Sequence, residues 1–325
     1  MEDQANSQQQ ITLSTILPAS WFTQPENSSV WITGFQIANV AAVNFPTPFT
    51  EINIGDILAV ILYGELTYFE LGKMILDSSV PDQLSLITPT PIQQRSPKSG
   101  WLLLITPYVV DGVQRDEPEV KHNIFAAAGF LAAFNGRNMI YEQVFHNVLE
   151  VQSGRLTTFS GVIVNSSTYP TPDLSSQRIN LIETATSQLS QLPVALKNRV
   201  WLSLRWYEAS LRSTGVDGFL QAWIALEVLG IDKADIRPVN EALARIYGIT
   251  LNEAKQRFDV GRICGIRSRI VHDGELVSIS QPISDYVEAI YVDVLYELLG
   301  LDTERRAESH INNPASTILQ LLKKI

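Results

Sequence analysis

The sequence predicts an α+β protein, in which a strand-rich mixed domain precedes an all-helical domain. Two observations carry this prediction. The first half of the chain contains runs of β-branched residues flanked by Pro, Gly and Asn, a pattern typical of strands. After residue 177 the apolar residues instead recur at helical spacing, in consecutive segments joined by short loops, which is typical of a helical bundle.

The N-terminal domain is expected over residues 1–165. A helix is expected over 121–134, where Asn135-Gly136 supplies the stop signal. Residues 141–151 fit a further helix or a strand, and periodicity does not decide between the two. The strand candidates of this domain are residues 30–43, 56–64, 101–110 and 156–165.

A turn-rich segment, residues 166–177, is expected to link the two domains, because it holds two prolines among Ser and Thr residues. The helical domain then covers residues 178–325. Thr250 is a candidate cap for one of its helices. The expected helices are residues 178–192, 195–212, 216–230, 238–247, 251–258, 260–274, 282–300 and 314–324.

The composition is that of a folded chain in a reducing compartment. Of the 325 residues, 45% are hydrophobic and 18% are charged, which is compatible with sizeable cores. The one cysteine, Cys264, excludes an internal disulfide and a multi-cysteine zinc site. The N-terminus lacks the pattern of a signal peptide, and the apolar runs are too short to span a bilayer. We therefore expect a cytoplasmic protein without membrane contact.

The charge is distributed unevenly along the chain. The net charge of −10 argues against a nucleic-acid-binding protein. However, 7 basic and 16 acidic residues precede residue 176, whereas 17 basic and 18 acidic residues follow from there. Residues 244–272 carry six basic groups and only two acids, Glu253 and Asp259. This stretch predicts a local positive patch within the helical domain.

Arg267 and His272 are five positions apart, and a glycine follows at 274. Histidine titrates near neutral pH and can exchange a proton, while arginine stays charged and can hold two phosphate oxygens. The pair suits RNA cleavage without a metal, in which a 2′-hydroxyl loses its proton and attacks the neighbouring phosphate. By spacing alone, most pairs of this kind are a surface arginine and a packed histidine.

The geometry of a helix limits how this pair can meet. Five residues on one continuous helix place two side chains about 140° apart. Convergence therefore requires that the helix starts, ends or bends between Arg267 and His272, and Gly274 favours an end. The apolar Ile270 and Val271 are expected to anchor the segment in the core. One motif supplies one titrating group, so we expect two copies facing each other in a two-fold homodimer.

The surroundings of the pair resemble the ApeA-like branch of the HEPN superfamily over roughly residues 178–300. The similarity lies in the order of three segments: FLQAWIALEVLG (219–230), RICGIRSRIVHDGEL (262–276) and DYVEAIYVDVLYELLG (285–300). The resemblance implies a helical bundle that dimerises and cuts RNA without a metal, in prokaryotic defence against phage or as a toxin. The N-terminal domain would then be a sensor or regulator.

The resemblance also implies roles for individual residues. Arg267 matches the phosphate-binding arginine and His272 the catalytic histidine. Glu227 matches an acid frequent in this branch and would orient one of the two, although a structural acid paired with an arginine fits it as well. Ser268 occupies a position that often holds Asn, Asp or His in the superfamily.

Three residues of the motif segment are candidates for binding RNA: Arg262, Ser268 and Arg269. For Arg262 and Arg269, solvated helix positions are the favoured alternative. The sequence contains no motif for a nucleotide cofactor, ATP or a zincin metal, so no cofactor and no metal are expected. Beside the RNA substrate, a regulatory or antitoxin partner is compatible with the resemblance.

A second hypothesis is a non-catalytic member of the superfamily, in which the bundle is a nucleotide- or protein-binding module within a defence complex. The acidic surface and Ser268 favour it.

Overall fold

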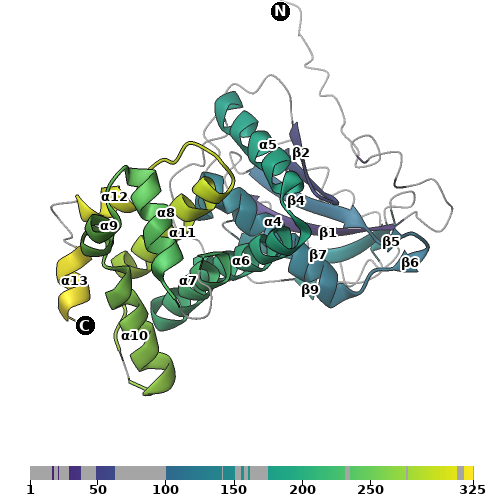
Figure 1. Cartoon of the computed structure of the whole chain (residues 1–325). Helices are drawn as coiled ribbons and strands as arrows, with labels where there is room; N and C mark the ends of the chain where they lie inside the picture. Colours follow the sequence, from purple (N-terminus) through teal and green to yellow (C-terminus); the bar gives the residue numbers. More distant parts are fainter. Residues whose placement is uncertain are drawn as a thin grey trace, which may run out of the picture. The chain divides into compact units, whose positions relative to one another are not determined.

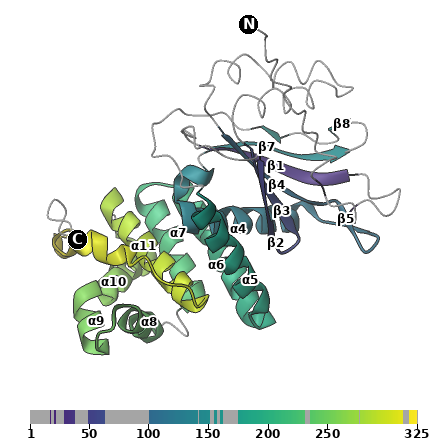
Figure 2. The same cartoon turned by 90° about the horizontal axis from the view of Figure 1, so that it is seen from above.

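The protein is an α+β protein, as the sequence predicts (Figures 1 and 2). It divides into two compact units, one built on a sheet and one built on helices. The computed structural model describes residues 17, 21, 29–37, 49–62, 100–140, 142–150, 155–156, 160–161, 175–230, 235–275, 277–312 and 318–324.

The sheet unit is built on antiparallel strands in the order β2-β3-β4-β1-β7-β8, with β9 paired to β7. A separate two-stranded ribbon joins β5 to β6. The strands are β1 (Ser29–Ile37), β2 (Phe49–Ile54), β3 (Ile57–Leu62), β4 (Gly100–Pro107), β5 (Val109–Val110), β6 (Val113–Gln114), β7 (Glu142–Glu150), β8 (Arg155–Leu156) and β9 (Ser160–Gly161).

The ambiguous segment 141–151 is a strand, β7, over its described residues. β1 pairs with β4 on one side and with β7 on the other, so β7 gains a full ladder of backbone hydrogen bonds. Thr33 on β1 faces His146 on β7, and the Thr33 hydroxyl lies 2.7 Å from His146 Nδ1 in the buried interior. These partners come from distant parts of the chain, which local periodicity cannot reveal.

The strand expected over 56–64 is β3, and it belongs to a hairpin with β2 that the sequence did not predict. Gly55 has φ of 64°, a left-handed conformation that glycine adopts without strain, and it lies in the two-residue turn of this hairpin. The expected strands 30–43 and 156–165 are found in part, as β1 and as β8 and β9; the rest of both ranges lies outside the described residues.

The expected helix over 121–134 is α4 (Glu117–Asn135), and its residues 125–133 group with the helical unit. A Cβ atom on Gly129 would lie 2.2 Å from the Leu204 carbonyl oxygen, so glycine permits this close approach to the next helical layer. The helical unit is therefore not a single stretch of chain from residue 178. Of the expected linker, residues 166–174 lie outside the described residues, and the next helix begins at Ser176.

The expected helices of the C-terminal half are all present, with small shifts at their described ends; residues 314–317 of the last one lie outside the described residues. α12 is an addition, because six residues are too few to show a helical period. The 3₁₀ helix η3 (Arg137–Ile140) follows α4. The helices are α5 (Ser176–Gln191), α6 (Val194–Arg212), α7 (Gly215–Gly230), α8 (Arg237–Tyr247), α9 (Leu251–Phe258), α10 (Val260–His272), α11 (Gln281–Leu298), α12 (Arg306–Ile311) and α13 (Ile318–Lys324).

α11 forms the centre of the helical unit and contacts α7, α8, α12 and α13. Tyr286, Tyr291 and Tyr296 on this helix are fully buried. The expected cap Thr250 begins α9 in a capping box: its hydroxyl accepts from the Glu253 backbone N–H at 3.2 Å. Among the helices of the described residues, none has the length and apolarity to cross a membrane.

Candidate functional site

α10 carries the Arg-x4-His pair, and its end determines where His272 lies. The helix begins at Val260 and ends at His272. The backbone N–H groups of Asp273 and Glu275 then both donate to the Arg269 carbonyl, at 3.1 and 3.2 Å. Gly274, with φ of 66°, turns the chain away from the helix axis. The imidazole of His272 is therefore exposed at the tip of α10.

Arg267 and His272 meet at this tip, with Arg267 Nη1 3.1 Å from His272 Nε2. α10 runs from Val260 to His272, so it neither starts nor ends between the two residues. The two Cα positions are about 7.5 Å apart along the axis. The long arginine side chain covers this separation and brings its guanidinium to the exposed ring.

The contact determines which tautomer His272 adopts. A guanidinium only donates hydrogen bonds, so Nε2 of His272 must accept. A hydrogen bond of this kind requires the tautomer that carries its proton on Nδ1. Nε2 holds the lone pair that a general base needs, and in this arrangement Arg267 occupies it.

Glu227 on α7 completes a cluster with this pair. Its Oε2 atom lies 3.4 Å from Arg267 Nη2, and the side chains of Arg267 and Glu227 are 25% and 26% exposed. The guanidinium thus contacts Glu227 with one terminal nitrogen and His272 with the other. The three residues predicted as catalytic lie together, and Glu227 acts directly on Arg267.

Cys264 neighbours the same cluster, one helical turn before Arg267. Burial raises the pKa of its thiol; the Glu227 carboxylate adds to this rise and Arg267 opposes it. The thiol is therefore protonated at neutral pH and is a poor nucleophile. Residues 264 and 267 are three positions apart on one helix and therefore lie on the same face. This spacing could have indicated from the sequence that Cys264 lies near Arg267.

The predicted RNA-binding residues are placed differently. Arg262 Nε lies 2.9 Å from Asp259 Oδ2, and Arg269 Nη1 lies 3.1 Å from Glu275 Oε2. Each of these arginines therefore has a nearby acid that offsets its charge. Residues 267 and 269 point to opposite sides of the helix, about 200° apart. Ser268 is half-buried on α10.

Ile270 and Val271, between Arg267 and His272, were both expected to anchor the segment in the core. Ile270 is half-buried, but Val271 is 49% exposed, so only the former contributes to anchoring α10. Val271 is one of the few large hydrophobic side chains that are exposed among the described residues, and it directly precedes His272.

No cluster of three or more His, Cys, Asp or Glu side chains suited to a metal ion occurs in the described ranges. The chain matched no protein-family model, no curated protein and no solved structure.

Proposed function

We propose that the protein is a metal-independent endoribonuclease whose site is the cluster of Arg267, His272 and Glu227, active as a homodimer in prokaryotic anti-phage defence or as a toxin. The observation that carries the proposal is the shared guanidinium: Arg267 contacts His272 at 3.1 Å and Glu227 at 3.4 Å. A permanent cation thus lies beside the imidazole at an exposed helix tip.

In the first step, an RNA phosphate binds Arg267. A guanidinium prefers two charged phosphate oxygens to one imidazole lone pair, since charge-assisted hydrogen bonds are the stronger ones. Arg267 thereby releases His272 Nε2, while Glu227 keeps the guanidinium in place. In this arrangement, His272 Nε2 is available as a base only when the RNA phosphate is bound.

His272 Nε2 then takes the proton of the 2′-hydroxyl. The 2′-oxygen forms a bond to phosphorus, and the bond from phosphorus to the 5′-oxygen breaks. Arg267 stabilises the negative charge that grows on the phosphate oxygens. The products are a 2′,3′-cyclic phosphate end and a 5′-hydroxyl end, and the leaving 5′-oxygen needs a proton.

A homodimer supplies that proton. Each chain brings one exposed histidine at the tip of α10, so two chains joined by a two-fold axis bring one base and one acid to a single phosphate. Val271 supplies an apolar surface beside the histidine on which two tips can pack.

The experiment is cleavage of RNA by the full-length protein in the presence of EDTA, with analysis of the product ends. We expect 2′,3′-cyclic phosphate ends, and a rate about a thousandfold lower for Arg267→Ala and for His272→Ala. Arg245→Ala is the matched control, because Arg245 is 59% exposed and paired with Glu297 away from the cluster. Inactivity of the wild-type dimer on every RNA tested, with harmless expression in cells, would overturn the proposal.

The dimer is tested separately with mixed chains. A heterodimer of one wild-type and one His272→Ala chain has one titrating histidine. We expect its cleavage rate to be far below half that of the wild-type dimer. A heterodimer with half the wild-type rate would show that each chain works alone.

The second candidate function is a non-catalytic nucleotide- or protein-binding module. The pairing of Arg262 with Asp259 and of Arg269 with Glu275 favours it, because these arginines are then less available to RNA. Under this alternative the protein binds a partner, and His272→Ala changes neither binding nor the effect of expression on cell growth.

A further inference from the structure

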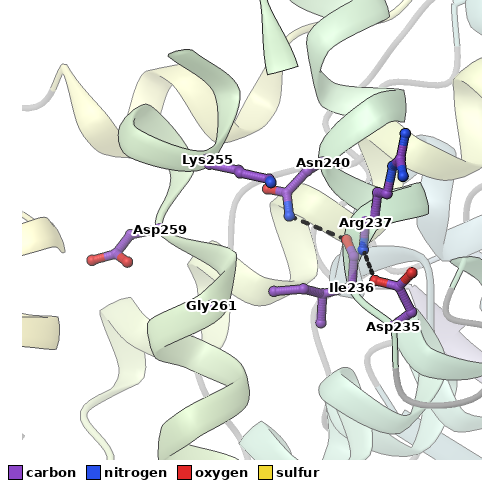
Figure 3. A pocket seen from close by; sticks show the side chains of 7 residues that line it. All are labelled: Asp235, Ile236, Arg237, Asn240, Lys255, Asp259 and Gly261. Carbon is purple, nitrogen blue, oxygen red and sulfur yellow. Dashed lines mark hydrogen bonds between the residues drawn. The ribbon is translucent and has the colours of Figure 1, made fainter. Parts of the chain in front are cut away.

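A second site lies at the other end of α10. Residues from α8, α9 and α10, with the segment before α8, surround a hollow of about 320 Å³ (Figure 3). This volume is within the range that holds small ligands in proteins. The described residues lining it are Asp235, Ile236, Arg237, Asn240, Lys255, Asp259 and Gly261.

Asn240 is the unusual member of this lining. The side chain is 1% exposed, and its Nδ2 group donates to the Ile236 carbonyl at 3.1 Å. That bond fixes the orientation of the amide, so Oδ1 is its free acceptor. Oδ1 has no hydrogen-bond partner among the described residues. A buried acceptor without a donor is unfavourable, and a ligand N–H or O–H removes that cost.

The charges around the hollow leave one cation free. Asp235 accepts from the Arg237 backbone N–H at 2.8 Å, and the Arg237 side chain pairs with Glu241 at 2.7 Å. Asp259 pairs with Arg262. Lys255 reaches toward the hollow from α9 and forms no ion pair within the described part of the chain (Figure 3). The two acids and two bases of the lining balance in charge, and the ammonium of Lys255 is the group that remains available to an anionic part of a ligand.

The third feature is an apolar surface. Ile236 and Gly261 lie on the same hollow, and a Cβ atom on Gly261 would lie 3.7 Å from Ile236 Cδ1. The absence of a side chain at Gly261 leaves a flat approach to the isoleucine. A flat ring fits such a surface better than a branched ligand does.

We propose that this hollow binds a nucleotide, whose base lies against Ile236 and Gly261 and donates an N–H to Asn240 Oδ1, and whose phosphate lies against Lys255. A nucleotide unites the three required properties in one molecule: a flat ring, N–H donors at the ring edge and an anionic phosphate.

The face of α10 connects this hollow with the Arg267 cluster. Gly261, Gly265, Ser268 and His272 follow one another at intervals of four, three and four residues, so they lie on one face of the helix. Gly265 has no atom within 4 Å of its Cβ position, so this face is open. The nucleotide is either free or a residue of the RNA strand that passes along this face to His272; the second source rests on the proposed function.

The test measures binding to the full-length His272→Ala protein by calorimetry. The probes are the four nucleoside 5′-monophosphates, the corresponding nucleosides, inorganic phosphate and short RNA oligonucleotides. Gly261→Ala introduces a methyl group at ordinary contact distance from Ile236, so the fold is kept while the surface for the base is lost. Gly265→Ala is the matched control for the free nucleotides: the same substitution on the same helix, outside the lining of the hollow.

We expect Gly261→Ala to weaken nucleotide binding by about tenfold or more and Gly265→Ala to leave it unchanged. Lys255→Gln should weaken the binding of nucleotides and leave that of nucleosides unchanged. Binding of RNA but not of free nucleotides, with the same dependence on Gly261, assigns the base to the RNA strand and supports the proposal.

Two outcomes overturn the proposal. In the first, Gly261→Ala weakens the binding of no nucleotide and no RNA. In the second, inorganic phosphate binds as tightly as the nucleotides do. These outcomes are separable from failure of the proposed ribonuclease. If the protein binds nucleotides but cuts no RNA, the nucleotide site stands and the proposed ribonuclease is wrong. If the protein binds no nucleotide and cuts RNA at a rate that Gly261→Ala and Lys255→Gln do not change, the ribonuclease stands and the nucleotide site is wrong.

Discussion

Glu227 on α7 holds Arg267 on α10 through a 3.4 Å contact between Oε2 and Nη2. The carboxylate contacts one terminal nitrogen of the guanidinium, and His272 contacts the other. Under the proposed mechanism, the carboxylate keeps Arg267 in place while the phosphate takes over the bond to the histidine. Glu227 is in this sense a positioning residue.

We therefore predict that Glu227→Gln lowers kcat for RNA cleavage by roughly tenfold to a hundredfold, because an amide replaces a charge-assisted contact worth about 1.5–3 kcal/mol. KM should change far less, and Glu227→Asp should restore part of kcat. Glu297→Gln is the matched control, since Glu297 is 27% exposed and pairs with Arg245. A parallel loss in both variants, or a fall in thermal stability that accounts for the loss, would contradict this role.

A buried polar network joins α8, α11 and α12. Tyr247 donates to Asp293 Oδ2 at 2.7 Å, and Asp293 also accepts from the backbone N–H groups of Arg306 and Ala307, each at 2.9 Å. Burial raises the pKa of Asp293, while these donors lower it. The carboxylate is 1% exposed and depends on the three donors.

Tyr247→Phe removes one of these donors. We predict a loss of about 2 kcal/mol in the free energy of unfolding, because a buried carboxylate loses a hydrogen bond. Tyr291→Phe is the control: Tyr291 is also buried, but its hydroxyl contacts the neutral Ser203 hydroxyl at 3.0 Å, and the expected loss is about 1 kcal/mol. Urea denaturation of both variants tests the difference, and equal losses would show that the charge of Asp293 is unimportant.

The comparison of sequence and structure separates local from distant effects. Helix α9 was predictable to the residue because Thr250 and Glu253 form its cap within one turn. The strand β7 was not, since Thr33 and β1, which decide its state, lie more than 100 residues away. The grouping of residues 125–133 of α4 with the helical unit could not be predicted for the same reason, because the close approach of Gly129 to Leu204 leaves no local sequence pattern.

The candidate site shows the same division. Arg267 and His272 lie on one helix, so a short motif could indicate their pairing. The sequence shows that acids occur near Arg262 and Arg269. It does not show which acid pairs with which arginine, because that depends on side-chain geometry. Asn240 belongs to no motif, and its buried, unpartnered oxygen exists only once α8 has folded against its neighbours.

His146 makes the sheet unit sensitive to acid. Burial lowers the pKa of its imidazole from 6.5 to about 4, and the charge of Lys121 adds to this effect. The unfolded chain binds a proton near pH 6.5 and the folded chain only near pH 4. Between these values the unfolded state binds more protons, so the free energy of unfolding falls as the pH falls.

We predict a loss of up to about 3 kcal/mol between pH 7 and pH 4 from this residue. The measurement is urea denaturation at both pH values, read by hydrogen exchange of the amides in β1 and β7. His146→Gln should lower this pH dependence, because the amide does not titrate. The same slope in wild type and variant would mean that other groups cause the acid sensitivity.

Val271 provides a direct test of the proposed dimer. Its side chain is 49% exposed next to His272, which is unfavourable for a valine that stays in water. Val271→Asp puts a charge where two α10 tips are proposed to meet, and two like charges across a two-fold axis repel each other. We predict dissociation into monomers in sedimentation velocity, and loss of RNA cleavage by more than about tenfold, with an unchanged melting temperature.

The matched control is Val113→Asp, since Val113 is 68% exposed on the β5–β6 ribbon of the sheet unit. This variant should remain dimeric and active. A Val271→Asp protein that stays dimeric places the dimer contact elsewhere on the surface. A monomeric Val271→Asp protein that still cuts RNA at the wild-type rate means that a single Arg267–His272 pair suffices, in which case a solvent molecule rather than a second histidine protonates the leaving oxygen.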